Sequence, residues 1–376
     1  EHAKLDICIK YGKLKLGFLS LNVQKETEMA NGKLLLGLDI GSSSAKVCLL
    51  KEVRGSYEVQ LVDSAEFSND PIVEGSILNG SAITDVIRDL VRTNGIKQKA
   101  CAIAISGYNV IVKRVRMPEM SEEELQENLR WEVEQHIPFD YEEVVVDTVI
   151  LERNQQQKKM EILLVATKKD VVRDYISIVR DAGLEVKIVD TVSFALHNLI
   201  EVFYPKETEN AVVGVINVGA AMTSMTMIVN GMPSFTRDIT IGGNQITEEI
   251  QKKFGITREE AEAFKTGKSQ SDGVVPADVE DVTKAVVENI VGEIRRSINF
   301  FYETTGCDRV DKIFLCGGAV KSPTTRRLFE KSLDAPVELI DLKNLACGKQ
   351  CNRDVLAEKG LELTVALGLA LRSANE

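Results

Sequence analysis

The chain repeats one pattern of apolar and polar positions twice, about 180 residues apart. Each copy begins with a run of β-forming residues, passes through a polar side chain, a glycine and several small or hydroxyl residues, and ends in a second apolar run. The copies span residues 34–50 and 212–229. We therefore predict two β-hairpins whose tips expose backbone N–H groups and hydroxyls, because glycine lets the chain come close to an anion.

The polar residues at these two tips are candidates for binding phosphate. One such hairpin alone is usually an ordinary turn, whereas the repeat indicates two similar halves that hold one phosphate chain between them. The first tip offers Asp39, Gly41, Ser42, Ser43, Ser44 and Lys46. The second tip offers Asn217, Gly219, Ala220, Thr223 and Ser224.

A third glycine turn follows another apolar strand, at residues 312–315, and precedes a helical segment at 322–333. Gly317, Gly318 and Ala319 form this turn. Because glycine has no Cβ, a flat base or ribose can lie directly against the backbone here.

The order of these turns resembles the actin, heat-shock ATPase and sugar kinase superfamily, in which two phosphate loops precede an adenosine loop. The segments ISGYNVI (105–111), MP (117–118), SEEEL (121–125) and EQHIPF (134–139) are similar to the PilM proteins of type IV pilus assembly. The segment TRDITIGGNQIT (236–247) is similar in PilM and in the cell-division protein FtsA. The resemblance runs from about Lys33 to Arg372.

This resemblance implies an α/β fold of the actin-like, ribonuclease H-like ATPase type, with two lobes and an inserted small α+β domain of the FtsA (SHS2) type. The first lobe is expected at 31–117 and 189–208, and the insert at 118–188. The second lobe is expected at 209–372, with a helical subdomain at about 245–305. Residues 1–30 join no motif and begin with glutamate, so we interpret them as an extension that is disordered or non-native.

Hydrophobic spacing places individual elements within this plan. Helices are predicted at 81–94, 121–137, 170–182, 279–302 and 361–371, and further strands at 100–105, 144–151, 161–166 and 337–339. Ser121 and Glu124 form a capping box at the start of the second helix. Residues 186–190 are predicted as the third strand of the insert, and residues 204–210 as a linker. Small residues in 361–371 indicate a helix that crosses closely between the lobes.

The resemblance implies ATP and Mg²⁺ as ligands. Asp39 is then expected to hold the water shell of Mg²⁺, with a turn-initiating aspartate as the structural alternative. Lys46 either adds charge to the phosphate site or faces solvent. Asn217 stands where the superfamily commonly has an acidic residue, so we predict nucleotide binding with weak ATPase activity at most.

The remaining candidate contacts also follow from the resemblance. Gly317, Gly318 and Ala319 are expected to pack on the adenosine. Glu293, together with Arg296 or Arg295, is expected to reach the ribose or base, unless its carboxylate is simply solvated. Gly242 and Gly243 shape the phosphate side or only the fold.

Composition narrows the function classes. The 376 residues are 44% hydrophobic and 27% charged, as expected for a globular chain with more than one core, and no uncharged run is long enough for a membrane span. A net charge of −11 disfavours nucleic acid and direct adhesion to anionic lipid. The seven cysteines are scattered, which fits a reducing cytoplasm. Cys347 and Cys351 are spaced as in a metal clip or a redox pair, but no second ligand pair or histidine is near, so we expect no special role for them.

The resemblance also implies a protein partner. PilM proteins hold the short cytoplasmic tail of PilN, a membrane protein, in a groove between the first lobe and the insert. Here the groove would be lined by residues 116–139 and the facing sheet edge, and the tail would bind by backbone pairing and apolar pockets. Other pilus platform proteins, or those of a related type II secretion system, and a second copy of the chain are further candidate partners. The expected location is the cytoplasm, at the inner membrane through the partner and without insertion.

Two alternatives stay open from the sequence. A small-molecule kinase of the same superfamily needs a catalytic carboxylate and a substrate pocket where this chain has the compact insert. An FtsA-like, filament-forming cell-division ATPase ends in an amphipathic membrane helix, whereas residues 373–376 follow directly after the predicted crossing helix.

Overall fold

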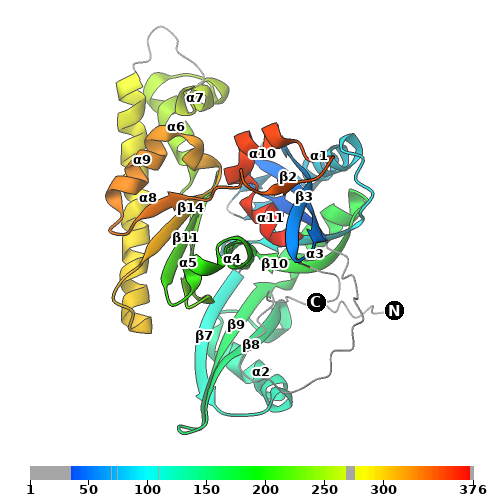
Figure 1. Cartoon of the computed structure of the whole chain (residues 1–376), viewed down its shortest axis with the longest axis vertical. Coiled ribbons are helices and arrows are strands. Elements are labelled where there is room, and N and C mark those ends of the chain that lie inside the picture. The colour runs from blue at the N-terminus through cyan, green and yellow to red at the C-terminus, as the bar shows by residue number, and fades with distance from the viewer. Residues whose placement is uncertain (1–34, 69, 74, 109, 268–275, 373–376) are drawn as a thin grey trace.

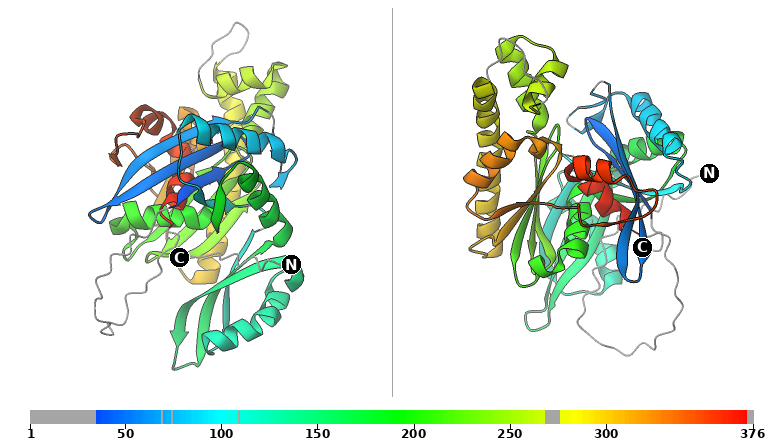
Figure 2. Two further views of the ribbon diagram at one scale, coloured as in Figure 1. Left: turned by 90° about the vertical axis from the view of Figure 1, so that its right-hand side faces the viewer. Right: turned by 45° about the horizontal axis from the view of Figure 1, so that its top comes forward.

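The computed structural model describes residues 35–372, except 69, 74, 109 and 268–275 (Figure 1). The predicted extension at 1–30 and the last four residues lie outside the described residues. Three larger sheets with their covering helices, together with one two-stranded sheet, make up most of the described chain. The small three-stranded sheet lies at one end of the molecule, and helices α6 (Gly243–Phe254) and α7 (Arg258–Lys265) lie at the other (Figures 1 and 2).

The first lobe is built on a six-stranded sheet in the order β10-β6-β1-β2-β3-β16. Its strands are β1 (Leu36–Ile40), β2 (Ser44–Val53), β3 (Ser56–Glu66), β6 (Ala100–Ile105), β10 (Glu185–Thr191) and β16 (Ala346–Cys347). A short hairpin, β4 (Ile72–Val73) with β5 (Ser76–Ile77), lies outside this sheet. β1 pairs antiparallel with β2, which confirms the first predicted hairpin.

Alternation along these strands sends side chains to two different cores. Cys101, Ile103 and Ile105 of β6 face α1 (Gly80–Thr93) and α3 (Lys169–Asp181), whereas Ala102 and Ala104 face α4 (Val192–Phe203) and α11 (Thr364–Ala370). The first helix is predicted correctly, because its buried residues repeat at helical spacing.

The second lobe is built on a five-stranded sheet in the order β13-β12-β11-β14-β15. Its strands are β11 (Val212–Val218), β12 (Thr223–Val229), β13 (Met232–Ile239), β14 (Lys312–Cys316) and β15 (Val337–Leu339). β11 pairs antiparallel with β12, confirming the second predicted hairpin, and parallel with β14. Its helices are α6 (Gly243–Phe254), α7 (Arg258–Lys265), α8 (Pro276–Thr305) and α9 (Pro323–Ser332), with the 3-10 helix η2 (Gly318–Lys321).

Helices α4 and α11 lie between the two large sheets, in one apolar core shared by both lobes. Their contact is very close: a Cβ on Gly368 of α11 would lie 1.8 Å from the carbonyl oxygen of Ala195 on α4. The predicted crossing helix with small residues is therefore confirmed. The chain reaches it from the second lobe through β16, α10 (Arg353–Lys359) and the 3-10 helix η3 (Gly360–Glu362).

The small sheet has the order β7-β9-β8 and packs against one helix. Its elements are β7 (Val110–Pro118), α2 (Glu122–His136), η1 (Tyr141–Glu143), β8 (Val144–Asn154) and β9 (Lys159–Lys168). The predicted capping box is present: Ser121 Oγ accepts from the N–H of Glu124, whose carboxylate accepts from the N–H of Ser121.

Two sequence predictions at the borders of this unit are wrong. Residues 186–190 are not its third strand, because β10 pairs with β6 of the first sheet, and β7 takes that place instead. Helix α3, predicted within the insert, packs with α1 in the core of the first lobe. The compact unit thus consists of residues 110–168. The predicted linker at 204–210 contains a one-turn helix, α5 (Pro205–Thr208).

Candidate functional site

The tips of the two long hairpins meet across the lobes. In the first tip, Gly41 N donates to the carbonyl of Ser44 at 3.0 Å, and in the second, Gly219 N donates to the carbonyl of Met222 at 2.9 Å. The backbone N–H of Ala221 donates to Ser42 Oγ at 3.2 Å. The structure therefore brings together the two segments that the repeat pattern singled out.

Two further glycine turns pack on the second tip. Gly243 N donates to the carbonyl of Gly219 at 2.9 Å, and a Cβ on Gly242 would lie 2.6 Å from the carbonyl oxygen of Ala220. Gly317 has a φ of +101°, and a Cβ there would lie 2.3 Å from the carbonyl oxygen of Val218. Both contacts are with backbone, so these two positions require glycine. The three predicted glycine turns and the Gly242–Gly243 segment therefore lie in contact with one another.

Asp39 and Lys46 form an ion pair beneath the first tip. They face each other across β1 and β2, with Lys46 Nζ 3.2 Å from Asp39 Oδ2. Both residues are buried, at 7% and 9% exposed. Of the two alternatives for Lys46, the solvent-facing one is therefore wrong. Lys46 Nζ also donates to the carbonyl of Ser44 at 3.4 Å, so the pair contacts the backbone of the first tip.

Asn217 lies near the end of β11, between Ser224 on β12 and Cys316 on β14. Its Oδ1 would be 2.7 Å from a Cβ on Gly317, so the amide touches the third glycine turn. Ser224 and Thr223 are buried at the start of β12, where Thr223 Oγ1 donates to the carbonyl of Ile241 at 2.8 Å. Thr223 therefore braces the strand-to-helix turn before Gly242.

Two ion pairs next to the glycine turns are not among the residues predicted from the sequence. Lys265 Nζ donates to the carbonyl of Gly243 at 3.2 Å and pairs with Glu262 at 2.6 Å. Burial lowers the pKa of Lys265, and the nearby Glu262 carboxylate opposes that shift. Lys321 pairs with Glu362 at 2.6 Å, beside Gly318. The spacing of Glu262 and Lys265 on one helix is common on protein surfaces, so it gave no distinctive signal.

Glu293 and Arg296 lie on α8 of the second lobe. They pair with each other one turn apart on α8, and the Arg296 hydrogen bond holds the pKa of Glu293 below its usual range, with a smaller effect from Arg237 on β13. Arg295 donates to the carbonyl of Ser332 instead. No hydrogen bond or ion pair recorded among the described residues joins the side chains of these three to the glycine turns.

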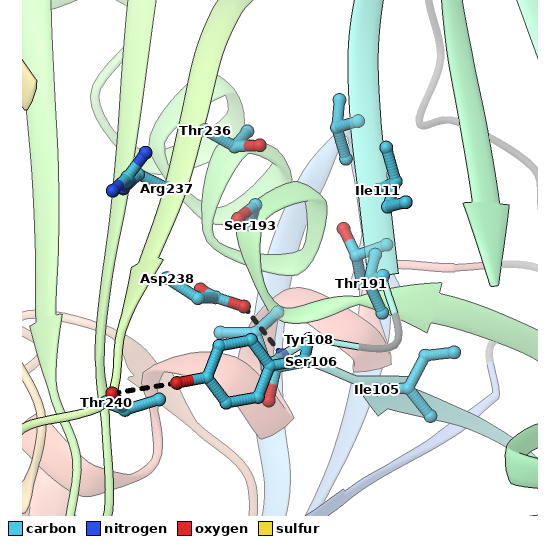
Figure 3. Close-up of a pocket in the computed structure, with 14 residues that line it drawn as sticks. Ile105, Ser106, Tyr108, Ile111, Thr191, Ser193, Thr236, Arg237, Asp238 and Thr240 are labelled. Carbon is cyan, nitrogen blue, oxygen red and sulfur yellow. Dashed lines mark hydrogen bonds between the residues drawn. The ribbon is translucent and has the colours of Figure 1, made fainter. Parts of the chain in front are cut away.

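A cavity of about 410 Å³ opens where the first lobe, the small unit and the second lobe meet (Figure 3). Apolar side chains from β6 and β7 line one side, and Thr236, Arg237 and Asp238 of β13, together with Thr240, line the other. Two hydrogen bonds cross it: Gly107 N donates to Asp238 Oδ2 at 2.6 Å, and Tyr108 OH donates to Thr240 Oγ1 at 3.1 Å.

The same loop also touches the second hairpin tip. A Cβ on Gly107 would lie 3.1 Å from the Cε methyl of Met222. The loop 106–108 thus contacts the glycine cluster on one side and leads into β7 on the other.

A second cavity, of about 340 Å³, lies on the small unit and is lined by Glu134, Ile137, Pro138, Phe139, Asp140 and Glu143. The first four of these residues belong to the region 116–139 that is expected to line a partner groove, and the last two lie just beyond it. The described residues include no helix with both the length and the apolar character needed to cross a membrane.

Two lobes that present paired glycine hairpins across a shared core define the actin-like class of ATPase folds. The chain matches the family described as "Type IV pilus assembly protein PilM" over residues 37–374. It belongs to this family, as the sequence resemblance predicts.

Solved structures agree with this assignment. The structure described as "PilM-PilN type IV pilus biogenesis complex" is 26% identical, with a TM-score of 0.79 and coverage of 91% of this chain and 98% of that one. The ethanolamine utilization protein EutJ of Carboxydothermus hydrogenoformans is 14% identical, with a TM-score of 0.55 and coverage of 90% and 89%, and shows the shared fold alone.

Among curated relatives, cell division protein FtsA of Bacillus subtilis (strain 168) is 23% identical over 261 residues, which is 63% of this chain. The ethanolamine utilization protein EutJ of Escherichia coli (strain K12) is 28% identical over 160 residues, which is 43% of this chain. The chain spans 58% and 50% of the lengths of these two relatives.

Proposed function

We propose that this protein is an ATP- and Mg²⁺-binding assembly protein of a type IV pilus platform, and that the nucleotide is a ligand that holds the lobes together. The observation that carries the proposal is the contact between the two tips, in which Ala221 N–H donates to Ser42 Oγ. A triphosphate placed there would meet backbone N–H groups and hydroxyls from both lobes. Binding that differs between open and closed lobes shifts the population toward the closed form.

The residues present fit a magnesium nucleotide. Asp39 would act on the water shell of Mg²⁺, and Lys46 would offset phosphate charge, with Ser42, Ser43 and Ser44 as phosphate contacts. Gly219, Ala220 and Thr223 would form the opposing phosphate contacts. Gly317, Gly318 and Ala319 would pack on the adenosine, and Gly242 and Gly243 would shape the phosphate side, to which we add Glu262 and Lys265. Mg²⁺, when bound, would neutralise phosphate charge.

The proposed activity is binding with weak hydrolysis at most. An amide at 217 cannot take a proton from water as a carboxylate can. The backbone of the second hairpin tip keeps its shape whichever residue stands at 217, because the N–H groups of Gly243 and Asn244 donate to the carbonyls of Gly219 and Ala220.

We further propose that the cytoplasmic tail of a PilN-like membrane protein binds next to the small unit, residues 110–168. The cavity of Figure 3 supports this, because it combines apolar side chains of β6 and β7 with polar groups of β13. An extended peptide could use both. The partner would keep this protein at the cytoplasmic face of the inner membrane, among other platform proteins.

The test is a titration with a fluorescent ATP analogue, with and without Mg²⁺. Asp39→Ala should weaken Mg²⁺-dependent binding at least about tenfold, since roughly 1.4 kcal/mol of lost interaction suffices. Asn217→Asp should retain binding. Asp89→Ala on the exposed face of α1 is the matched control and should bind like the native chain.

Because Asp39→Ala leaves Lys46 buried without its carboxylate, thermal unfolding without nucleotide is measured in parallel. Asp39→Asn provides a second variant of nearly the same shape. If either folded variant binds Mg²⁺-nucleotide as tightly as the native chain, Asp39 has no role in binding. If the native chain itself fails to bind, the nucleotide proposal is wrong.

A further inference from the structure

Two cysteine sulfurs lie almost within bonding distance at the edge of the first sheet. Cys351 Sγ donates to Cys347 Sγ at 2.9 Å. A disulfide needs a separation of about 2.05 Å, so the two atoms need to approach by less than ~1 Å. Both thiols are free and half-buried.

The turn that carries this pair is held in place by the backbone. Cys347 belongs to β16, which pairs parallel with β3. Gly348 N donates to the carbonyl of Val59 at 2.8 Å, and Cys351 N donates to the carbonyl of Gly348 at 3.2 Å. The two side chains therefore meet because a tight turn brings them together, and little rearrangement is needed to join them.

The other described thiols differ in access. Cys48, Cys101 and Cys316 are fully buried, and burial raises the pKa of Cys101 and Cys316 to about 12, so their reactive thiolates are scarce. Cys307 is half-buried, and its side chain belongs to the α8 core of the second lobe, away from any other described thiol. Only the pair at 347 and 351 combines access with a neighbouring sulfur among the described residues.

We propose that Cys347 and Cys351 form a reversible dithiol–disulfide pair that exchanges with low-molecular-weight disulfides. One thiolate attacks the reagent, its S–S bond breaks, and one reagent thiol leaves. The second cysteine then attacks the protein sulfur of this mixed disulfide and expels the other reagent thiol. The protein loses two electrons and two protons, and the reagent is reduced to two thiols.

The two thiols differ in their surroundings. Cys347 Sγ accepts the S–H of Cys351 and donates its own S–H to the carbonyl of Leu345 at 3.7 Å. Burial and the hydrogen bond to Cys347 raise the pKa of Cys351 to about 12, which keeps its proton in place. Cys347 is therefore the first nucleophile and Cys351 the resolving one.

Oxidation would restrain the segment that leads from β16 through α10 and η3 to α11, the helix between the lobes. After this turn the chain forms α10 and η3, where the carbonyl of Leu361 accepts from Gly317 N at 2.8 Å. A disulfide closes the turn against β3 and so removes local opening at the start of this path. The amide of Gly348 is the reporter, because its hydrogen bond to Val59 must break for the turn to open.

The experiment uses the full chain carrying Cys8→Ser and Cys307→Ser, because Cys8 lies outside the described residues. The reduced, folded protein is treated with 4,4′-dithiodipyridine and followed by thiopyridone release and intact mass. We expect two thiopyridones per chain, with a product that has lost two hydrogen atoms and carries no adduct. Adding Cys351→Ser should give one thiopyridone and a stable pyridylthio adduct.

Hydrogen exchange provides a second readout. The Gly348 amide should exchange at least about fivefold more slowly after oxidation and recover its original rate after reduction. Two persistent adducts, an unreactive pair, or an intramolecular disulfide that leaves Gly348 exchange unchanged would each overturn the proposal.

Discussion

Charged side chains buried between the lobes are the residue-scale feature with the largest expected effect on stability. Arg372, 1% exposed, donates from Nε and Nη2 to Asp190 Oδ2 at 2.8 and 2.6 Å. Burial raises the pKa of Asp190, and the Arg372 charge opposes that shift. His197, on α4, is 4% exposed, and its Nε2–H donates to the carbonyl of Gly231 at 2.8 Å. These groups occupy the shared core that both sheets cover.

The protonation of His197 should make stability fall below about pH 6.5. Burial lowers its pKa below the ordinary 6.5, and the charge of Arg372 lowers it further, whereas the Gly231 hydrogen bond opposes both. The unfolded chain therefore takes up the proton first, so the free energy of unfolding decreases as pH falls from 6.5 toward the folded pKa, by at most ~1.4 kcal/mol per pH unit.

Urea unfolding at about pH 7.5 and about pH 5.5 measures this slope. His197→Gln keeps an N–H donor without a titrating ring and should flatten the slope, whereas His136→Gln on the surface of α2 should not. Equal slopes for the native chain and His197→Gln would show that His197 does not titrate as argued.

At the scale of elements, the contact between α11 and α4 sets how closely the lobes can pack. Gly368→Ala should destabilise the protein by about 1–3 kcal/mol, because the new Cβ would overlap the carbonyl of Ala195 and neither backbone can move freely. The expected sign is opposite to that of an ordinary helical Gly→Ala change, which stabilises by roughly 0.5–1 kcal/mol.

Gly292→Ala in α8 is the matched control. A Cβ there would meet only Arg296 Nη1, at 3.9 Å, so this variant should be more stable than the native chain. Urea midpoints of the two variants give the comparison. If both substitutions stabilise, the close helix contact has no energetic importance.

Local signals predicted the hairpins, the capped helix α2 and the long helix α8, because each depends on residues close in sequence. The place of β10 depends on pairing with β6, about 85 residues away, and its apolar alternation suits either sheet. The sequence therefore predicted a strand there but assigned it to the wrong sheet. For the same reason, the range predicted for the first lobe, 31–117, includes most of β7, whose pairing with β9 is not visible in the local pattern.

The candidate site follows the same rule. Asp39 and the glycines of the tips carry their own turn chemistry, so the sequence located them. Lys265 becomes part of the site only because α7 packs on α6, which brings its ammonium to the carbonyl of Gly243. The contact of Glu293 and Arg296 with the ribose or base rests on the resemblance alone and stays a prediction, and helical spacing pairs the two with each other.

At the scale of the whole molecule, the loop 106–108 links the proposed nucleotide site to the proposed partner site. It contacts Met222 beside the second tip, hydrogen-bonds to Asp238 across the lobes, and continues into β7. Ligands at the two sites should therefore influence each other through a coupling free energy, and the coupling must be reciprocal.

We predict that ATP tightens binding of a PilN-tail peptide to the native chain by at least about fivefold, which corresponds to ~1 kcal/mol of coupling. The ratio of peptide affinities with and without Mg²⁺-ATP measures this coupling. Asp238→Ala should make the two affinities equal, whereas Asp238→Asn, which retains a carbonyl acceptor for Gly107 N–H, should keep most of the difference. Fluorescence anisotropy of a labelled peptide, with and without Mg²⁺-ATP, gives both affinities.

The ratio separates coupling from direct contact, because Asp238 also lines the cavity. A variant that merely loses a peptide contact weakens binding equally in both nucleotide states and leaves the ratio unchanged, which would exclude this hydrogen bond from the coupling. Tyr108→Phe removes the second cross-lobe hydrogen bond, to Thr240, and leaves Gly107 in place. It should reduce the ratio less than Asp238→Ala does, because Tyr108 is 64% exposed and the Gly107–Asp238 bond is charge-assisted.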